Sequence, residues 1–307
     1  MTRAQLTLGL TALLLAIVSW GPMFPLAKRA LLHVDAYWLG TLRYCGATVL
    51  FLTALWWTEG RQALRYEGRF GLISLFGLAG IVGYNLLVWI GLSSTRPEHA
   101  AILMALQTPL TALLYWVWKS QRPLSFTIAC MVVALFGVAL VVTNGNLHSA
   151  FADGSLVGDL LVLAGAACWI VYTAGMQFTP NWSPLRFTAL SAIPGCIGLI
   201  VALSIATATG AAHTPGVAAL GSIAWQLGFF TLFSTFLGVL CFNIGIKNVG
   251  ALNAMLLLNM VPVVTFAIEA ALGRRFTWIE ICGAGLVIAA LIANNLYLRW
   301  RTRATAS

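Results

Sequence analysis

Residues 102–123, ILMALQTPLTALLYWVWKSQRP, and residues 256–276, LLLNMVPVVTFAIEAALGRRF, share one pattern although they lie half a chain apart. In each stretch a proline, Pro109 or Pro262, stands in the middle of an apolar run, and basic residues follow before the next apolar run begins. The two prolines are 153 residues apart in a chain of 307. This correspondence predicts that the second half of the chain repeats the first.

The composition indicates that most of the chain lies in lipid. Hydrophobic residues make up 60% of the sequence, charged residues 8%, and the mean hydropathy is +0.91, whereas soluble domains carry about a quarter charged residues. The six cysteines all fall inside apolar runs, which favours packing roles over disulfides or a metal cluster. We therefore expect no metal and no cofactor.

The length of the apolar runs predicts the fold class. A transmembrane helix needs about 20 mostly apolar residues, and the chain supplies ten such runs. The prediction is an all-α membrane protein with ten transmembrane helices, arranged as two inverted five-helix repeats around a central cavity. The runs are 5–29, 36–58, 70–92, 98–118, 124–143, 156–177, 185–207, 222–246, 250–272 and 277–298.

Basic residues beside the spans predict the orientation, because cytoplasmic loops carry an excess of Lys and Arg. With the N-terminus inside, eleven basic residues are cytoplasmic: Arg3, Arg61, Arg65, Arg69, Lys119, Arg122, Arg186, Lys247, Arg299, Arg301 and Arg303. Five lie on the opposite side: Lys28, Arg29, Arg96, Arg274 and Arg275. Both termini are therefore predicted to be cytoplasmic, and the net charge of +9 reflects this rule and anionic lipid headgroups rather than nucleic-acid binding.

The repeat predicts two domains, residues 1–148 and residues 149–307. Five spans separate each element from its copy, and because five is odd, the second copy enters the membrane from the opposite side. Two further matches keep the same order, Trp20 with Trp169 and Gly91 with Gly245. Inverted repeats are typical of secondary transporters, in which two related halves open a central site alternately to each side.

The stretches AAILMALQTP (residues 100–109) and NAMLLLNMVP (residues 253–262) resemble the fourth and ninth helices of a known family. That family is the EamA branch of the drug/metabolite transporter superfamily, and the resemblance covers essentially the whole chain. Within it, the sequence is most similar to bacterial inner-membrane exporters of aromatic and other amino acids. The resemblance implies a central cavity walled by helices 1, 3, 4, 6, 8 and 9, with helices 5 and 10 supporting each half. As partners we expect a small-molecule substrate and the lipid bilayer, with a monomer as one possible state of the protein.

Four polar side chains at membrane depth are candidates for contact with substrate: Asn85, Gln107, Asn253 and Asn259. Hydrocarbon cannot satisfy their hydrogen-bonding groups, so we expect them to face the interior of the bundle. Two roles stay open, contact with substrate and hydrogen bonds that tie helices together.

The two prolines are candidates for hinge or gating residues. A proline within a helix removes a backbone donor and frees the carbonyl four residues earlier, here that of Ala105 or Leu258. A freed carbonyl in lipid must find a partner or line a cavity. The alternative for Pro109 and Pro262 is a kink that only shapes the packing.

Aromatic residues complete the predicted pocket. Trp20 and Trp169 lie deep in their spans and correspond under the repeat, and Asn85 and Trp89 share one face of the third helix beside Tyr84. Such walls suit a planar amphiphilic metabolite that stacks on aromatic rings or places an ammonium over tryptophan. Plain packing is the alternative for Trp20 and Trp169.

Charged residues bear on how transport is driven. Proton-coupled carriers keep an ionisable group deep in the membrane, whereas the acidic residues here fall in connectors or near span ends, which favours uncoupled facilitated diffusion. His99 and Glu269, near the outer mouth, are candidates for titrating groups. Arg43 is the one charge well inside a span, where its stem could snorkel to the interface or the charge could pair locally.

Three other classes of function are alternatives to an uncoupled exporter. The first is proton-coupled efflux of drugs or organic cations. The second is a membrane-embedded enzyme, which would need a cluster of carboxylate, His or Ser groups at one depth. The third is a channel, which would need a ring of polar residues. The sequence contains neither pattern. No ATP-binding or common hydrolase motif is present, so we expect a secondary carrier and not an enzyme.

Overall fold

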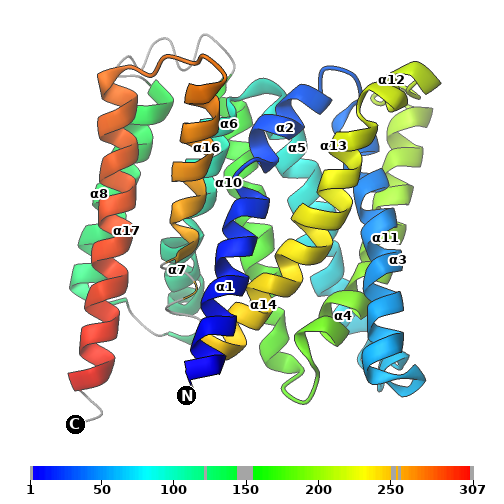
Figure 1. The fold of residues 1–307 in the computed structure, drawn as a ribbon, viewed down its shortest axis with the longest axis horizontal. Helices are drawn as coiled ribbons and strands as arrows, with labels where there is room; N and C mark the ends of the chain where they lie inside the picture. The colour runs from blue at the N-terminus through cyan, green and yellow to red at the C-terminus, as the bar shows by residue number, and fades with distance from the viewer. Residues whose placement is uncertain (1–2, 121–122, 144–154, 250–253, 255–256, 305–307) are drawn as a thin grey trace. The chain divides into compact units, whose positions relative to one another are not determined.

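A computed structural model describes residues 3–120, 123–143, 155–249, 254 and 257–304, and all regular structure among them is helical (Figure 1). Eight helices are long and apolar enough to cross a membrane, and the apolar helix Met260–Ala271 is shorter. The protein is therefore an all-helical membrane protein. The helices are α1 (Arg3–Trp20), α2 (Met23–Ala30), α3 (Ala36–Glu59), η1 (Arg61–Leu64), α4 (Phe70–Gly77), η2 (Leu78–Gly83), α5 (Tyr84–Ser94), α6 (Pro97–Ala105), α7 (Gln107–Lys119), α8 (Ser125–Thr143), α10 (Ser155–Gly175), η3 (Met176–Phe178), α11 (Pro184–Ala208), α12 (Val217–Ser222), α13 (Ala224–Phe229), η4 (Phe230–Leu237), α14 (Gly238–Val249), α16 (Met260–Ala271) and α17 (Trp278–Ala304).

Among the described residues, the predicted runs coincide with one helix or with a consecutive group of helices, but several runs are interrupted; residues 250–253, 255 and 256 of the ninth run lie outside the described residues. The run 98–118 was expected to be one kinked helix, and the structure instead ends α6 at Ala105 and begins α7 at Gln107. The run 70–92 and the run 222–246 each contain a π-helical segment, η2 and η4. Such segments are rare and occur often at functional sites.

The chain divides into two compact units that each draw on distant parts of the sequence. Unit 1 consists of residues 1–25, 94–160 and 241–307, and unit 2 of residues 26–93 and 161–240. This division differs from the predicted sequence halves 1–148 and 149–307. The halves describe a repeat in the sequence, which stays a prediction.

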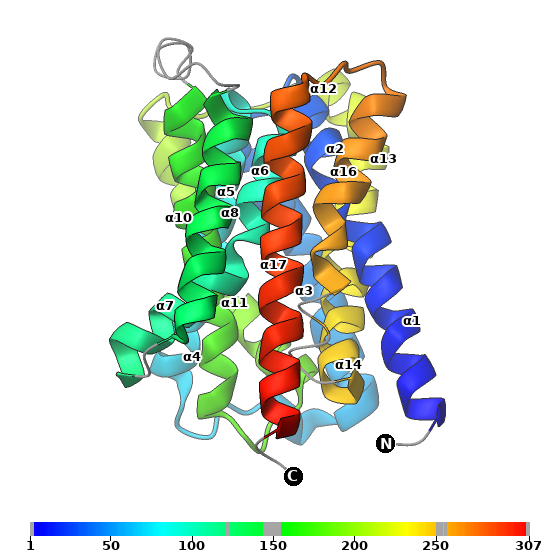
Figure 2. The same ribbon diagram turned by 90° about the vertical axis from the view of Figure 1, so that its left-hand side faces the viewer.

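In unit 1, α8 packs along α17, and α16 packs against α6 and α1 (Figures 1 and 2). The first contact depends on two glycines. A Cβ atom on Gly137 would lie 2.7 Å from the carbonyl oxygen of Gly283, and a Cβ on Gly283 would lie 2.7 Å from that of Gly137. Only glycine permits this approach, because real Cβ atoms do not come so close to a carbonyl oxygen.

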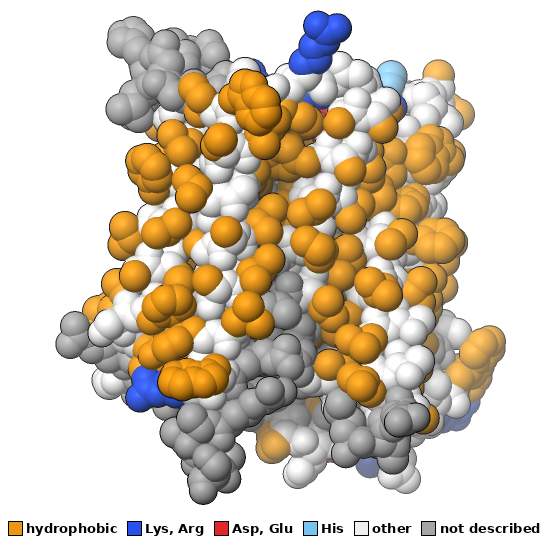
Figure 3. All heavy atoms as spheres, turned by 60° about the vertical axis from the view of Figure 1, so that its left-hand side comes forward, with side chains coloured by type: hydrophobic (Ala, Val, Ile, Leu, Met, Phe, Trp, Pro, Cys, Tyr) orange, Lys and Arg blue, Asp and Glu red, His pale blue; other side chains and the backbone are white. Residues whose placement is uncertain are grey.

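The surface of the molecule matches a lipid environment. Figure 3 shows one face on which hydrophobic side chains cover the middle and Lys and Arg side chains lie near the two ends. Large exposed hydrophobic residues on α8 and α17 include Phe136 and Leu296. In water such a surface would be an aggregation liability, whereas in a bilayer it contacts acyl chains.

In unit 2, α11 packs against α3, α4 and η2. The connector between α3 and α4 meets the connector before α11, because Glu67 accepts hydrogen bonds from Trp182 (2.9 Å) and Arg186 (2.7 Å). These two bonds hold the pKa of Glu67 below its usual range. At the opposite end of α3, its N-cap residue Asp35 accepts a hydrogen bond from the backbone N–H of His213 (3.0 Å). Each contact joins two connectors that the charge distribution predicts on one side of the membrane, the first pair on the cytoplasmic side and the second pair on the external side.

Candidate functional site

Two helices of unit 1 break at matching positions. Leu106 separates α6 from α7 with φ −68° and ψ −5°, and Asn259 precedes α16 with φ −61° and ψ −9°. Each break lies three residues before a proline, so that Pro109 and Pro262 fall in the first turn of a new helix. The first-turn N–H groups of a helix have no intrahelical partner, and proline is tolerated there without loss of a hydrogen bond. The prolines therefore accompany one-residue breaks between helices, and their role as hinges stays a prediction.

The polar residues at these breaks lie in different surroundings. Asn259 is 2% exposed, and its Nδ2 has no hydrogen-bond partner among the described residues. Gln107 is half-buried, and its Nε2 donates to Sδ of Met104 at 3.2 Å. Asn253, also predicted to contact substrate, lies outside the described residues. In unit 1, Gln107 and Asn259 thus both lie at the start of a helix that contains a proline, Gln107 in α7 and Asn259 just before α16.

Trp20 also belongs to unit 1, at the end of α1. Its ring centroid lies 5.3 Å from that of Phe242 in α14, and the side chain is half-buried. The next residue, Gly21, accepts a hydrogen bond through its carbonyl from Oγ1 of Thr265 in α16 (2.8 Å). This bond fixes the end of α1 against the helix that follows the Asn259 break.

Unit 2 holds the other predicted pocket residues. The ring of Tyr84 lies 5.2 Å from that of Trp169, and Nε1 of Trp89 donates to Oδ1 of Asn85 at 3.0 Å. Asn85 also donates to the carbonyl of Ile81 (2.7 Å). The predicted shared face of Asn85 and Trp89 is confirmed by their hydrogen bond. Both functional groups of the Asn85 amide are thus bonded within the protein.

Arg43 is buried beside these residues in α3. Its guanidinium carbon lies 5.1 Å from the ring centroid of Trp89 and 5.4 Å from that of Tyr44, and the residue is 3% exposed. The snorkelling alternative is therefore wrong, since the charge stays inside the protein. A cation held over aromatic faces gains electrostatic stabilisation from the rings.

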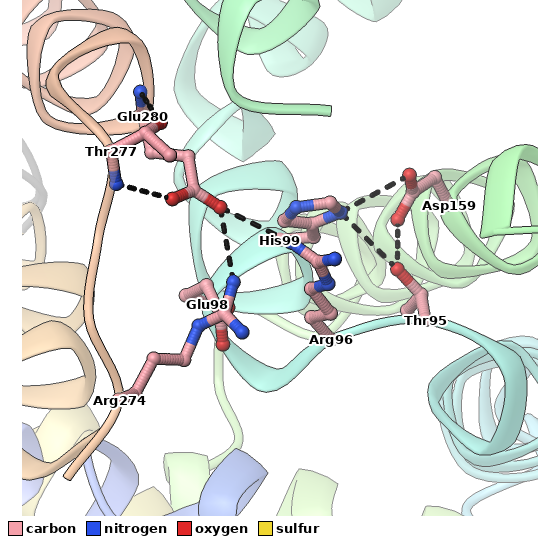
Figure 4. Close-up of polar contacts among 8 residues, drawn as sticks. All are labelled: Thr95, Arg96, Glu98, His99, Asp159, Arg274, Thr277 and Glu280. Carbon is pink, nitrogen blue, oxygen red and sulfur yellow. Dashed lines mark hydrogen bonds and ion pairs between the residues drawn. The ribbon is translucent and has the colours of Figure 1, made fainter. Parts of the chain in front are cut away.

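Four charged residues form an ionic cluster at one end of unit 1 (Figure 4). Arg274, in the connector between α16 and α17, forms ion pairs with Glu98 of α6 and with Glu280 of α17 (3.0 Å to Glu280). Arg96 also pairs with Glu280 at 3.2 Å. Glu98 and Glu280 are 0% and 1% exposed. Buried carboxylates require such partners, because an unpaired buried charge is strongly destabilising.

Local sequence explains how Glu280 comes to this position. Its backbone N–H donates to Oγ1 of Thr277 (3.2 Å), while its carboxylate accepts from the backbone N–H of Thr277 (2.8 Å). These reciprocal bonds form a capping box at the start of α17. The Thr-x-x-Glu spacing was visible in the sequence, but it gives no information about the arginines that Glu280 meets.

Beside the ionic cluster, Thr95, His99 and Asp159 form a buried triad (Figure 4). The hydroxyl of Thr95 donates to Oδ1 of Asp159, and Nδ1 of His99 lies 3.5 Å from Oδ2 of Asp159. The three residues are 1%, 3% and 3% exposed. The sequence had singled out His99 but not its carboxylate partner. Glu269, the other predicted titrating residue, is half-buried on α16 and is not among the residues of Figure 4.

A multi-pass helical protein with breaks and buried charges in its helices has the architecture of a membrane transporter. The EamA-like transporter family matches residues 7–143 and again residues 156–296. The chain therefore belongs to the EamA family, whose members are transporters and not enzymes.

Two relatives are similar over nearly the whole chain. The uncharacterized transporter YrdR of Bacillus subtilis (strain 168) is 32% identical over 303 residues, which cover 97% of this chain and 94% of the relative. The uncharacterized transporter YyaM of the same organism is 29% identical over 280 residues, 91% of this chain and 90% of the relative. A crystal structure with 20% sequence identity covers 97% of this chain and 99% of its own with a TM-score of 0.66, which shows that the fold is shared.

Proposed function

We propose that this transporter exports small amphiphilic metabolites, chiefly aromatic and other apolar amino acids, across the bacterial inner membrane. Transport proceeds by alternating access and is uncoupled, so that the substrate's own gradient drives it. The observation that carries the proposal is the pair of helix breaks at Leu106 and Asn259, which lie 153 residues apart and each precede a proline by three residues.

The breaks support a substrate site in unit 1. Backbone that leaves a helix at membrane depth is tolerated where it is buried in protein or lines a cavity. The N-terminus of α16 favours a negative charge, and the buried amide of Asn259 stands there with an available donor. The carboxylate of an amino acid fits both groups.

Aromatic residues supply the apolar part of the proposed site. We assign substrate contact to those residues of unit 1 that the sequence singled out, and hinge roles to Pro109 and Pro262. Stacking of a substrate ring on tryptophan or tyrosine contributes about 1 kcal/mol per pair beyond burial. In unit 1 the proposed contact residues are Trp20, Gln107, Asn253 and Asn259. For Tyr84, Trp89 and Trp169, which belong to unit 2, contact with substrate stays a prediction. Asn85 is assigned a structural role, because both functional groups of its amide are bonded within the protein.

The proposal includes two inverted repeats, residues 1–148 and 149–307, with both termini cytoplasmic. Contacts between corresponding elements support it: Gly137 and Gly283 meet reciprocally between α8 and α17, and Sγ of Cys45 lies 3.2 Å from Sγ of Cys196 between α3 and α11. The π-helical segments η2 and η4 begin at Leu78 and Phe230, a similar spacing. The family match to each half adds to this support.

Labelling of single cysteines from either side of intact cells tests the inversion. We expect positions in connector 59–69 to be cytoplasmic and positions in connector 208–219 to be external, because these connectors follow corresponding helices of the two halves. Both connectors labelled from the same side would contradict the inverted repeat. Position 300, beside Arg299 and Arg301, serves as a cytoplasmic reference.

Counterflow in proteoliposomes tests the transport activity. Vesicles loaded with an unlabelled amino acid should take up the labelled amino acid from outside, and aromatic and apolar amino acids should compete best in a panel that includes organic cations. Vesicles without protein supply the control. Stronger competition by organic cations than by any amino acid would replace the proposed substrate class by drug or cation efflux.

One observation favours the proton-coupled alternative, namely the buried pair of His99 and Asp159. An imposed pH gradient separates the two mechanisms. Uncoupled transport predicts no accumulation of amino acid against its own gradient. Accumulation that a protonophore abolishes would establish proton coupling.

A further inference from the structure

An open groove runs along α16 and α17 within unit 1. The two helices lie side by side and are joined by connector residues 272–277 (Figures 1 and 2). The groove encloses about 350 Å³, and its nine lining residues are all glycine, alanine, valine, isoleucine or phenylalanine. No lining side chain therefore offers a polar atom, and the groove suits a ligand, or part of a ligand, that is wholly apolar.

Small residues on both helices create the groove. Val263, Ala267 and Ala270 are spaced by four and three residues and so share one face of α16, and Ala284 and Gly285 line the groove from α17. A Cβ atom added to Gly285 would have no neighbour within 4 Å among the described residues. The described part of the chain thus leaves the space beside Gly285 unfilled.

The length of the groove matches a lipid tail. From Val263 to Ala270 it follows α16 for about 10 Å, at a rise of 1.5 Å per residue. One leaflet of a bilayer contributes about 15 Å of hydrocarbon, half of the usual core. An unfilled groove would lose dispersion contacts along its walls, whereas an acyl chain lying in it contacts two helices instead of one. An acyl chain from a single leaflet therefore fits the groove.

A positive charge stands at the connector end of the groove. Arg275 directly precedes the lining residue Phe276, and its side chain is exposed. Among the described residues, no ion pair involves Arg275. Arginine is well suited to phosphate, because its planar guanidinium donates two parallel hydrogen bonds. Arg275 can therefore bind the phosphate of a lipid whose tail lies in the groove.

The carboxylates nearby leave this positive charge available to an anion. The two carboxylates of the ionic cluster are buried and paired with arginine. Glu269 of α16 lies four residues after the buried Thr265, and the groove is lined by other positions of that helix. The headgroup that complements Arg275 is therefore one with a net negative charge.

We propose that the groove between α16 and α17 binds one molecule of an anionic phospholipid, with an acyl chain along the two helices and the phosphate on Arg275. A zwitterionic phospholipid binds less tightly, because its ammonium group would stand near the same guanidinium. The bound tail adds contacts between α17 and α16, the helix that follows the Asn259 break. This binding does not depend on the identity of the transported substrate.

The first test counts bound lipid by native mass spectrometry of the full-length protein, released from detergent micelles. Dioleoyl phosphatidylglycerol, which is anionic, and dioleoyl phosphatidylcholine, which is zwitterionic, are compared at equal concentration. We expect one bound phosphatidylglycerol, with an affinity about fivefold above that for phosphatidylcholine, roughly the contribution of one basic residue near anionic lipid. Equal affinities of the wild-type protein for the two lipids would overturn the proposal.

Two variants separate the role of the charge from that of the groove. Arg275→Gln should bind both lipids equally, whereas Arg29→Gln, which changes an exposed arginine outside the groove, should keep the wild-type preference. Gly285→Leu fills the groove and should abolish retention of either lipid. Its control is Gly71→Leu in α4, because Gly71 is also helical and has no neighbour for an added Cβ among the described residues. Unchanged binding by Gly285→Leu, or an unchanged preference in Arg275→Gln, would contradict the site.

Thermal unfolding in micelles checks the folding of the variants and gives a second measure of binding. Added phosphatidylglycerol should raise the unfolding temperature of the wild-type protein, because a ligand that binds only the folded state stabilises it. The rise should be much smaller for Gly285→Leu. Where Gly285→Leu does not fold, the lipid preference of Arg275→Gln decides the proposal. A wild-type protein whose unfolding temperature does not respond to phosphatidylglycerol would refute it.

A second copy of the chain is the competing occupant of the groove. Native mass spectra would then show a dimer that Gly285→Leu converts to a monomer, in place of a monomer with one bound lipid. That outcome would overturn the lipid site and make the groove an interface between two copies. Neither measurement uses a transported substrate, so failure of amino-acid counterflow would overturn the proposed function and leave the lipid site intact.

Discussion

Replacement of Arg274 by glutamine is expected to lower the free energy of unfolding by about 3 kcal/mol, because it leaves the buried carboxylate of Glu98 without its cation. Glu98 is 0% exposed, and the ion pair that the structure gives it is with Arg274. The loss lies at the lower end of the range for broken buried pairs, since Arg96 still compensates Glu280. Denaturation in detergent micelles, followed by circular dichroism, measures the change.

The neighbouring arginine supplies the control for this prediction. Arg275 is exposed, and no ion pair involves it among the described residues, so Arg275→Gln should change stability by less than about 0.5 kcal/mol. Adding Glu98→Gln to Arg274→Gln should restore much of the loss, because the unpaired charge is then absent. Equal stability of Arg274→Gln and Arg275→Gln would contradict the ionic cluster.

Replacement of Asn259 by leucine is expected to reduce transport strongly while leaving the protein as stable as the wild type. The Asn259 side chain is buried with an unused donor, and removing an unsatisfied buried polar group costs little stability. If this amide binds the substrate carboxylate, its loss weakens binding by about tenfold or more, the usual effect of a hydrogen bond to a charged group. Counterflow kinetics and thermal unfolding of the same preparation give both quantities.

Asn85→Leu is the matched comparison, because both residues are buried asparagines. Here the change removes the acceptor of the Trp89 indole N–H, and we expect a loss of about 1–3 kcal/mol in stability. A functional asparagine and a structural one should thus give opposite patterns. A large loss of stability in Asn259→Leu, with normal transport by the protein that remains folded, would assign Asn259 to packing.

The helical fold could be predicted because its signals are local. Within the described residues, length and hydropathy defined the runs that the structure forms as helix, since apolar composition and the thickness of a bilayer determine such segments. The sequence predicted less accurately how the fourth run, 98–118, is interrupted. A proline at position 109 predicts disturbance upstream, but the sequence does not decide between a kinked helix and a new helix that begins at Gln107.

The candidate site could be predicted only where its residues are close in sequence. The hydrogen bond between Asn85 and Trp89 follows from helical periodicity, whereas the partners of Glu98 and His99 come from connectors and helices far along the chain. In the sequence, Glu98, Asp159 and Glu280 stand near span ends, which decides neither burial nor exposure. Tertiary packing buries them, and a single sequence contains no signal for that packing.

Unit 1 is built from three separate segments of the chain, and this has a consequence for folding during synthesis. Its segments are residues 1–25, 94–160 and 241–307, so that α6 and α8 leave the ribosome long before the helices against which they pack. Until α17 is synthesised, Gly137 faces no partner backbone and Glu98 no arginine from the last connector. Until then, the growing chain must keep the carboxylate of Glu98, which is buried in the finished protein, in the translocation machinery or at the membrane surface. A chain that stops before residue 274 would leave this carboxylate without Arg274, and quality control would recognise the chain by that charge.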